Sequence, residues 1–246
     1  MAVHISGTTA LVTGANRGIG KALVEALLAR GAVRVYATAR RPESLEPLVA
    51  AGAGRVVAIA LDVTRPEQVA AVADRAGDVT LLVNNAGVAS HMFGAFDDPR
   101  WITAGREEFE VNVLGTLAVT QAFRPVLAAQ GGGAVVNIAS VGSFVGFPVA
   151  LTYAAAKAGT HSLTQATRAM LRDQGTFVAG VYPGPTDTDM ATRLPFEKTP
   201  PTAVAHAILD GLEAGVEDIL PDPVARQMGA AYFSGPKQLE QQAVPA

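Results

Sequence analysis

The sequence predicts an α/β fold, a doubly wound parallel sheet with helices on both faces. Short apolar segments rich in β-branched residues alternate along the chain with longer amphipathic segments, at the spacing of strand–helix repeats. The expected strands are apolar throughout, which is typical of parallel strands that are covered on both faces. No linker, internal repeat or low-complexity stretch divides the 246 residues, so we expect one domain over residues 1–246.

The first half of the chain contains four expected strands separated by three expected helices. The strands are the apolar runs at residues 9–14, 33–39, 55–63 and 79–87. The helices occupy residues 17–31, 41–52 and 65–77. Proline near the start of the second and third helices, and glycine at the end of the first and third, mark their boundaries, because proline suits a first helical turn and glycine suits a helix end.

The second half continues the alternation. Long helices are expected at about residues 107–129 and at 151–174, and a shorter one at 200–215. Strands are expected at residues 133–140 and 177–184, with a short seventh strand within 217–222. The segment after Pro221 shows no clear pattern. Right-handed crossovers between the parallel strands would place the helices on both faces of the sheet.

The composition excludes several classes of function. The net charge is −3, and there is no block of lysine and arginine that could bind nucleic acid or a membrane surface. No apolar run approaches the ~20 residues of a membrane-spanning helix, and no secretory signal is expected at the N-terminus. There is no cysteine and the four histidines are scattered, so we expect no metal site. A cytoplasmic protein is the expectation.

A glycine-rich turn, TGANRGIG at residues 13–20, joins the first expected strand to the first expected helix. Glycine permits a tight turn there and lets backbone N–H groups approach a pyrophosphate at the helix N-terminus. The spacing is G-x-x-x-G-x-G rather than the commoner G-x-G-x-x-G, and a tight turn without a ligand is the alternative. The residues of this turn expected to bind the cofactor are Gly14, Asn16, Arg17, Gly18, Ile19 and Gly20.

The end of the second expected strand, ATARR, indicates which dinucleotide is preferred. An NAD site usually has an acid here that binds the ribose 2′-hydroxyl, but Ala39 has no carboxylate. Arg40 and Arg41 follow it, and Arg17 lies in the glycine-rich turn. Guanidinium groups suit a 2′-phosphate, and one charge-assisted hydrogen bond is worth roughly 1.5–3 kcal/mol. We therefore expect NADP(H) to be preferred over NAD(H), the alternative being that Arg40 and Arg41 are solvated loop residues.

Asp62 ends the third expected strand, in the segment ALDVT. Its carboxylate could accept a hydrogen bond from the amino group of an adenine, with Val63 packed near the ring. An aspartate that only stabilises a turn or a helix start is the alternative.

Beyond the glycine-rich turn, several short motifs follow in a fixed order over about residues 11–190. They are NNAG at 84–87, Asn112 in EVNVLGT, Ser140 in VVNIAS, YAAAK at 153–157 and YPGPTDT at 182–188. In this set and order the sequence resembles the short-chain dehydrogenase/reductase family. The resemblance implies a single Rossmann-like domain that binds a nicotinamide cofactor. It also implies a catalytic set of Ser140, Tyr153 and Lys157 with a supporting Asn112.

The resemblance further implies which residues contact the cofactor. Those beside the adenosine ribose, which also support the central sheet, would be Asn85, Ala86 and Gly87. Those that flank the nicotinamide and its phosphates would be Pro183, Gly184, Thr186 and Thr188. Tyr153 and Lys157 complete the expected cofactor contacts, because the lysine ammonium could bond the nicotinamide ribose.

The chemistry of the proposed catalytic residues agrees with carbonyl reduction. Ser140 follows an expected strand, where parallel sheets place their ligands, and its hydroxyl can donate to a substrate carbonyl oxygen. A tyrosine with a pKa of about 10 is a proton donor near neutral pH. Lys157 lies four residues from Tyr153 on one helix face, and its charge favours the phenolate that alcohol oxidation requires. Taken alone, Ser140 could serve a turn and the Tyr–Lys pair could be a surface contact.

The sequence also suggests roles for two further polar residues, Asn112 and His161. Asn112 interrupts an apolar stretch, and the resemblance implies that it holds a water linking Lys157 to solvent; a packing or capping role is the alternative. His161, two turns beyond Tyr153, is expected at the surface or at an interface rather than in catalysis.

Apolar residues in the loops after the strands predict a lipophilic pocket, with an ordinary core position as the alternative for each of them. They are Met92, Phe93, Phe96, Phe144, Phe147, Met190, Leu194 and Phe196. The expected substrate is therefore a neutral, partly hydrophobic ketone or aldehyde, together with the matching alcohol. Many family members end with an Asp-Gly-Gly segment that builds a subunit contact, and this chain does not. The helices beginning near Glu107 and Leu151 are therefore the expected interface of a homo-oligomer, either a homodimer or a homotetramer, and the missing segment speaks against the usual tetramer.

The leading interpretation is an NADP(H)-dependent carbonyl reductase or alcohol dehydrogenase that uses Tyr153 as general acid and base. One alternative is a reductase of carrier-bound β-ketoacyl groups, for which only Arg100 and Arg106 offer a basic surface. Another is an NADP(H)-sensing binding protein without chemistry, although such a protein would not need Ser140, Tyr153 and Lys157 together. A serine hydrolase is disfavoured because no G-x-S-x-G turn surrounds Ser140.

Overall fold

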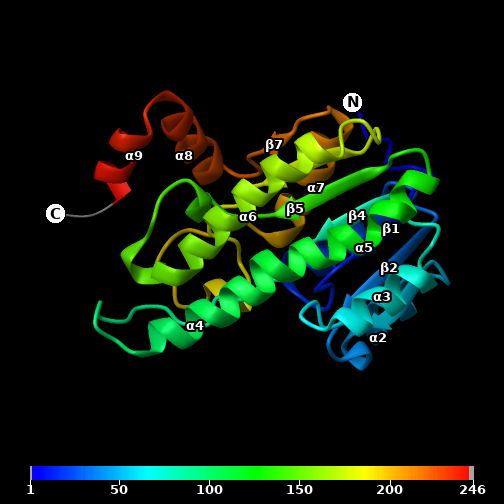
Figure 1. Ribbon diagram of the computed structural model, residues 1–246, viewed down its shortest axis with the longest axis horizontal. Coiled ribbons are helices and arrows are strands. Elements are labelled where there is room, and N and C mark those ends of the chain that lie inside the picture. Colours follow the sequence, from blue (N-terminus) through cyan, green and yellow to red (C-terminus); the bar gives the residue numbers. More distant parts are fainter. Residues whose placement is uncertain (1, 244–246) are drawn as a thin grey trace.

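Seven parallel strands form one sheet in the order β3-β2-β1-β4-β5-β6-β7 (Figure 1). The computed structural model describes residues 2–243, and this arrangement confirms the predicted doubly wound α/β fold. The chain builds the sheet outward from β1 to β3 and then returns beside β1 with β4, so the strand order reverses between β1 and β4. Parallel α/β sheets bind ligands at such a switch point, beyond the carboxyl ends of the strands. The single-domain prediction extends to Met1 and residues 244–246, which lie outside the described residues.

The first half of the chain follows the predicted alternation. Its strands are β1 (Thr9–Val12), β2 (Arg34–Ala39), β3 (Val56–Ala60) and β4 (Leu81–Asn84). Its helices are α1 (Gly18–Ala29), α2 (Glu46–Ala51) and α3 (Pro66–Arg75), with a 3₁₀ turn at Pro42–Leu45 before α2. The predicted strands were longer than these, because the apolar runs continue past the hydrogen-bonded ladder into the loops that carry Gly14, Val63 and Asn85.

The second half contains β5 (Ala134–Ile138), β6 (Phe177–Val181) and β7 (Asp218–Ile219). Its helices are α4 (Arg100–Phe109), α5 (Thr116–Ala129), α6 (Leu151–Met170), α7 (Pro201–Glu213), α8 (Pro223–Ser234) and α9 (Pro236–Ala243). The helix predicted at 107–129 begins earlier, at Arg100, and contains a π-helical turn at Glu110–Gly115 between α4 and α5. The two C-terminal helices were not predicted, although Asp222 before Pro223 is a recognisable helix start.

Helices cover both faces of the sheet. Buried residues of α1 and α7, with Leu45 and Leu48 beside them, pack on one face, while α3 and α5 pack on the other. The central strands β1, β4, β5 and β6 are therefore covered on both faces and are buried along their whole length. In Figure 1, α4 lies at the same end of the molecule as α8 and α9, and the loop between β5 and α6 lies between them.

No helix within residues 2–243 combines the length and the apolar character that crossing a membrane requires.

Candidate active site

One pocket of about 1150 Å³ lies beyond the carboxyl ends of the strands. It follows the switch point between β1 and β4 and continues past β5 and β6 to the C-terminal helix α8. Nearly all the residues predicted to bind cofactor or to act in catalysis line it: Gly14, Asn16, Arg17, Gly18, Ile19, Gly20, Arg40, Asp62, Val63, Asn85, Ala86, Gly87, Ser140, Tyr153, Lys157, Pro183, Gly184, Thr186 and Thr188. Asn112 and Arg41 are not among the lining residues.

The glycine-rich turn leaves the start of α1 open to this pocket. Arg17, the residue before the helix, makes no side-chain capping hydrogen bond, and the first turn of α1 carries no acidic residue. Helix N-termini with free N–H groups attract anions. Gly14 has a φ of +64°, and a Cβ there would lie 2.9 Å from the Cα of Ala86, so the turn requires glycine at this position.

Asn85 and Thr13 join the glycine-rich turn to the end of β4. The Asn85 side-chain amide donates to the carbonyl oxygens of Thr13 and Gly14, at 2.8 and 3.0 Å. The Thr13 hydroxyl accepts from the backbone N–H groups of Asn85 and Ala86, both at 2.9 Å. These hydrogen bonds fix the two sides of the switch point relative to each other, in line with the supporting role expected for Asn85.

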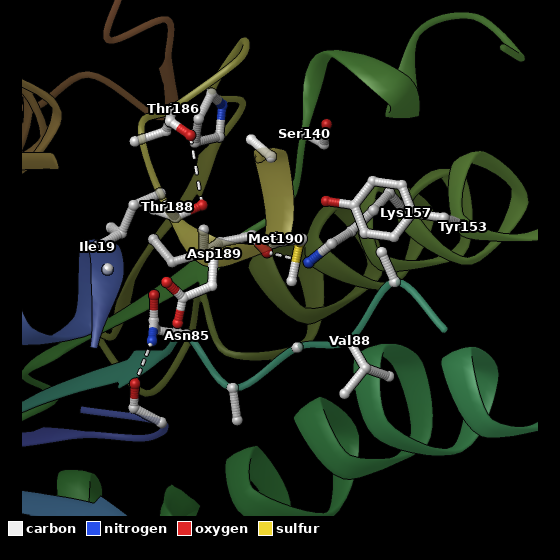
Figure 2. Close-up of a pocket in the computed structure, with 18 of the residues that line it drawn as sticks. Ile19, Asn85, Val88, Ser140, Tyr153, Lys157, Thr186, Thr188, Asp189 and Met190 are labelled. Carbon is white, nitrogen blue, oxygen red and sulfur yellow. Dashed lines mark hydrogen bonds between the residues drawn. The ribbon is translucent and has the colours of Figure 1, made fainter. Parts of the chain in front are cut away.

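Arg17 contacts a residue that the sequence did not associate with it. Its guanidinium donates to a carboxylate oxygen of Asp189 at 2.8 Å, although the two residues are 172 positions apart. Both side chains are largely exposed, so this ion pair contributes little to stability, about 0–1 kcal/mol. It joins the glycine-rich turn to the loop after β6 across the pocket, and Figure 2 shows Asp189 between Ile19 and Lys157.

Arg40 and Arg41 are separated by the fold. Arg40 lines the pocket, whereas Arg41 lies outside it and its carbonyl oxygen accepts from the Ser44 hydroxyl at 2.6 Å. Arg41 immediately precedes the 3₁₀ turn at Pro42–Leu45. The prediction that both arginines face the cofactor therefore has structural support for Arg40 only.

Asp62 forms a local turn and also lines the pocket. One of its carboxylate oxygens accepts from the backbone N–H and the hydroxyl of Thr64, at 3.0 and 2.7 Å. Burial would raise the pKa of Asp62, but the Thr64 hydrogen bonds and the charges of Arg40 and Arg65 together lower it. The carboxylate is thus ionised and engaged in a turn, with its second oxygen open to a donor from a ligand.

Ser140, Tyr153 and Lys157 lie together on one side of the pocket. Figure 2 shows them facing the same space, with Ile19, Asn85 and Thr186 opposite. Ser140 follows β5, and its hydroxyl accepts from the backbone N–H of Gly142 at 3.1 Å, which leaves the hydroxyl proton free to donate. Tyr153 and Lys157 lie one turn apart near the start of α6, and the lysine nitrogen is 5.8 Å from the centre of the tyrosine ring. That nitrogen donates to the carbonyl oxygen of Ile138 at 2.7 Å.

Burial shifts the acidity of both groups. It raises the pKa of Tyr153 to about 12; the Ser140 hydroxyl acts in the opposite direction and the negative charge of Glu108 in the same one. Burial also lowers the pKa of Lys157 to about 8. The lowered phenol pKa expected from Lys157 is thus not found here, because desolvation of the phenolate dominates. Tyr153 is a protonated donor throughout the neutral range.

Asn112 lies in the π-helical turn and supports the wall of the pocket. Its side chain accepts from the backbone N–H of Val88 and donates to the Val88 carbonyl oxygen, both at 2.9 Å. The backbone carbonyl oxygen of Asn112 accepts hydrogen bonds from the hydroxyls of Thr116 and Thr160. A Cβ at Gly87 would lie 3.0 Å from the Asn112 side-chain oxygen and 3.4 Å from the Lys157 nitrogen, so both side chains approach the same point. π turns often occur at functional sites.

The C-terminal helix α8 forms a wall of the pocket that the sequence did not reveal. Asp222 is 1 % exposed; one of its oxygens caps α8 at Ala225 N, and the other accepts from the Gly184 N–H at 2.7 Å. A Cβ at Gly184 would lie 2.6 Å from the Asp222 oxygen, so glycine allows the helix to approach. Asp222 thereby fixes α8 against the Pro183–Gly184 turn, and Val224 and Met228 of α8 line the pocket.

The predicted lipophilic pocket is confirmed for five of the eight apolar residues and wrong for three. Those that line the pocket are Met92, Phe147, Met190, Leu194 and Phe196. Phe144 is instead buried between Tyr182 and Tyr232, with ring centres 4.7 and 4.8 Å away. Phe96 is 91 % exposed, and Phe93 packs under the guanidinium of Arg193. The eight residues are alike in being apolar and in lying in loops. Tertiary packing decides which of them reach the pocket, and the local sequence does not show this.

His161 is buried, and the expected surface position is wrong. Its Nδ1 lies 2.6 Å from the Tyr182 hydroxyl, which in turn donates to Asp218 at 3.2 Å. Tyr182 immediately precedes Pro183, so this buried network supports the turn beside the catalytic residues. His161 belongs to the buried side of α6, together with Lys157 and Thr164.

Within residues 2–243, no group of three or more His, Asp or Glu side chains is arranged to hold a metal ion.

Comparisons with known proteins identify the family. Residues 8–198 match the family model described as short chain dehydrogenase. The chain is 36% identical over 198 residues to the galactitol 2-dehydrogenase (L-tagatose-forming) of Cereibacter sphaeroides, covering 78% of this chain and 76% of that protein. It is 32% identical over 197 residues to the 3-oxoacyl-(acyl-carrier-protein) reductase FabG of Vibrio cholerae, covering 78% of this chain and 79% of that protein.

Solved structures resemble the chain over nearly its whole length. A short chain dehydrogenase from Burkholderia cenocepacia, in complex with NADP, has a TM-score of 0.89 at 36% identity and covers 99% of this chain and 100% of its own. One from Burkholderia phymatum, in complex with NAD, has a TM-score of 0.81 at 25% identity, with 99% and 98% covered. With the motif order and the sheet topology already established, the chain belongs to the short-chain dehydrogenase/reductase family and is an oxidoreductase of that family.

Proposed function

We propose that the protein is an NADP(H)-dependent carbonyl reductase or alcohol dehydrogenase with Tyr153 as general acid and base. The observation that carries the proposal is the convergence of Ser140, Tyr153 and Lys157 on one side of a pocket whose other side is the glycine-rich turn. Tyr153 is protonated near neutral pH because burial raises its pKa to about 12, which suits donation to a carbonyl oxygen.

The pocket fits a dinucleotide. The open N-terminus of α1 suits a pyrophosphate, and Gly14 and Gly18 keep the backbone clear of side chains. Asp62 and Val63 would contact the adenine, and Thr186 and Thr188 the nicotinamide end. A volume of about 1150 Å³ exceeds that of a typical ligand pocket and accommodates a substrate beside the cofactor. When bound, NADP(H) supplies or accepts the hydride.

The residues of this chain then handle the oxygen and its proton. The Ser140 hydroxyl donates to the substrate carbonyl oxygen and so stabilises the negative charge that develops there. Tyr153 donates its phenolic proton to the same oxygen, and the reverse reaction uses the phenolate as base. The charge of Lys157 stabilises that phenolate. We propose that Asn112 holds a water beside Lys157, which would return the proton from solvent.

The cofactor preference depends on Arg40. Arg40→Ala should lower kcat/KM with NADPH by roughly ten- to a hundredfold, the equivalent of one charge-assisted hydrogen bond, and leave kcat/KM with NADH nearly unchanged. Arg41→Ala is the matched comparison, and it should alter neither value because Arg41 lies outside the pocket. Initial rates with both cofactors measure the effect, and faster turnover of the parent enzyme with NADH would contradict the proposed preference.

The substrate class follows from the apolar wall. The side chains of Phe147, Leu194 and Met228 offer no hydrogen-bond partners, so a polyol bound there would lose hydrogen bonds to water without replacing them. A ketone with an apolar substituent loses none. The likeness to a galactitol dehydrogenase therefore does not extend, in our proposal, to its substrate.

Met228 should limit the size of the substituent. Met228→Ala should raise kcat/KM for ketones with a larger apolar group by roughly tenfold, and Met228→Trp should lower it, because a pocket discriminates by about 1–3 kcal/mol per methylene. A series of ketones of increasing chain length measures this, with cofactor affinity as the control. Equal size profiles for the parent and both variants would exclude α8 from the substrate wall.

A panel of ketones incubated with NADPH tests the proposed function itself. Loss of NADPH absorbance with simple apolar ketones supports it. Turnover restricted to carrier-bound β-ketoacyl substrates favours the alternative suggested by the likeness to the Vibrio cholerae reductase. Cofactor binding without turnover of any substrate favours a sensor.

We also propose a homo-oligomer formed through α6 and the long helical segment that runs from the end of α4 through α5. The exposed apolar side chains of Phe109, Leu114 and Leu151 lie on or beside these helices. Light scattering of the purified protein distinguishes a dimer from a tetramer.

A further inference from the structure

Glu108 is a carboxylate in an unexpected place. It lies on α4, one turn before Asn112, and is 0 % exposed, whereas its neighbours Glu107 and Glu110 are exposed. The other buried side chains of α4 are Trp101 and Ala104. Burying a carboxylate is unfavourable unless it is well paired, and an apolar side chain would satisfy this helix face. A specific role is therefore needed to explain the charge.

One oxygen of Glu108 fixes the wall of the pocket. It accepts from the backbone N–H of Ser90 at 2.7 Å. Asn112 forms hydrogen bonds with Val88, which lies two residues before Ser90 in the same loop. Glu108 and Asn112, one helical turn apart, therefore attach the Val88–Ser90 segment to the helix, and Val88 and Ala89 of this segment line the pocket.

The other carboxylate oxygen of Glu108 accepts no hydrogen bond from the described residues. It is buried, as is the Thr152 hydroxyl oxygen, which has no partner among these residues either. Helix α4 packs against α6 at this level, since a Cβ on Gly105 would lie 3.1 Å from a methyl carbon of Thr152. Tyr153 follows Thr152, and the charge of Glu108 acts on its phenol, adding to the dominant effect of burial in raising the pKa of Tyr153.

Other charged groups lie on α6, on the loop after β4 and on the helical segment of Glu108. Lys157 lies on α6, and the loop after β4 contributes His91 and Asp98, which are 3.1 Å apart and pair with each other. Arg100 also binds Asp98, so that carboxylate is already matched. Glu107 and Glu110, on the same helical segment, also line the pocket, but their side chains are exposed and solvent screens their charges.

We propose that Glu108 is a positioning residue of this site: it fixes the Val88–Ser90 wall through Ser90, and it places a buried carboxylate, with one oxygen unpaired among the described residues, on α4 where that helix packs against α6. The inference rests on the proposed function, because it assigns Tyr153 as the proton donor. The inference also concerns the direction of the reaction. A negative charge at Glu108 would favour carbonyl reduction, which uses the phenol, over alcohol oxidation, which uses the phenolate.

Glu108→Gln separates the charge from the hydrogen bond. Glutamine keeps an oxygen for Ser90 N–H but carries no charge, so the phenolate becomes easier to form. The ascending limb of kcat/KM for alcohol oxidation should move to lower pH by about one unit, with a roughly tenfold gain in oxidation near neutral pH. Reduction at pH 7 should change little. Glu67→Gln, an exposed glutamate on α3, is the matched control and should leave the profile in place.

Glu108→Leu tests the wall independently of turnover. Loss of the Ser90 hydrogen bond should speed amide hydrogen exchange across residues 88–91, whereas Glu108→Gln should not. An oxidation profile of Glu108→Gln that superimposes on that of the parent overturns the charge role, and unchanged exchange in Glu108→Leu overturns the wall role. A parent protein that turns over no carbonyl or alcohol contradicts the proposed function instead, while the exchange result still reports on Glu108.

Discussion

Tyr153→Phe should lower kcat/KM for ketone reduction by about 1000-fold while NADPH binding is retained, a loss typical of removing a general acid. Phenylalanine keeps the aromatic ring, so the shape of the pocket and the packing of α6 are preserved. It removes the phenolic hydroxyl, which lies on the same side of the pocket as Ser140. Ser140 can still polarise the carbonyl, but the alkoxide that forms on hydride arrival then lacks a positioned proton donor.

Kinetics and cofactor titration together decide this prediction. NADPH affinity measured by fluorescence should match that of the parent protein, and the deficit should lie in kcat. Tyr232→Phe is a suitable control, because it removes a phenol from the aromatic stack on Phe144 without touching the pocket. If Tyr153→Phe retained most of the parent rate, Tyr153 would not be the acid and the proposed mechanism would be wrong.

Lys157→Met should lower kcat for reduction by about 100-fold, since a neighbouring opposite charge shifts the acidity of a group by about 1–3 pKa units. Methionine has a similar length and apolar stem, so the buried position remains filled. The change removes the positive charge that stabilises the departing phenolate. It also deprives the Ile138 carbonyl oxygen of its donor at 2.7 Å.

The pH dependence gives this prediction a second measurement. Burial lowers the pKa of Lys157 to about 8, so the ammonium is present below that pH and is lost above it. For the parent enzyme, kcat/KM for reduction should therefore fall as the pH rises through about 8. Lys157→Met has no ammonium to lose, so this limb should be absent from its profile. A parent profile that stays flat to pH 10 would show that the lysine charge is not required.

Stability measurements separate these effects from unfolding. Lys157 is buried and Tyr153 is half-buried on α6, so each variant needs a thermal unfolding curve beside its rates. Lys21→Met, an exposed lysine on α1, controls for the chemical change and should keep both the rate and the pH profile.

Much of the fold could be predicted from local pattern. Apolar β-branched runs bounded by glycine and proline located all seven strands, because parallel strands buried on both faces must be apolar along their length. The boundaries were less accurate. The π-helical turn was missed because Asn112 and its carbonyl oxygen are held there by Val88 and by Thr160 of α6, which are contacts between separate elements.

The motif residues of the candidate site could be predicted from the sequence. The contacts that distant segments make with them could not. The glycine-rich turn, Ser140, Tyr153 and Lys157 lie at strand ends that the topology gathers at one edge, so motif order was sufficient to bring them together. Arg17 is different: its contact with Asp189 depends on the loop after β6 folding back over the glycine-rich turn. The apolar residues of α8 were missed because nothing local indicates which loop that helix packs against.

By itself, the sequence determined the order of the strands and the membership of a dehydrogenase family, and it supplied the side chains that we propose as the reacting groups. Those properties depend on residue type and spacing along the chain, which backbone hydrogen bonding and side-chain periodicity convert directly into structure. Only the tertiary structure decided that Arg40 rather than Arg41 lines the pocket, that α8 forms part of its wall, and that Glu108 rather than Glu107 is buried. These outcomes depend on burial by distant segments, and burial is what changes the strength of a charge or the acidity of a group.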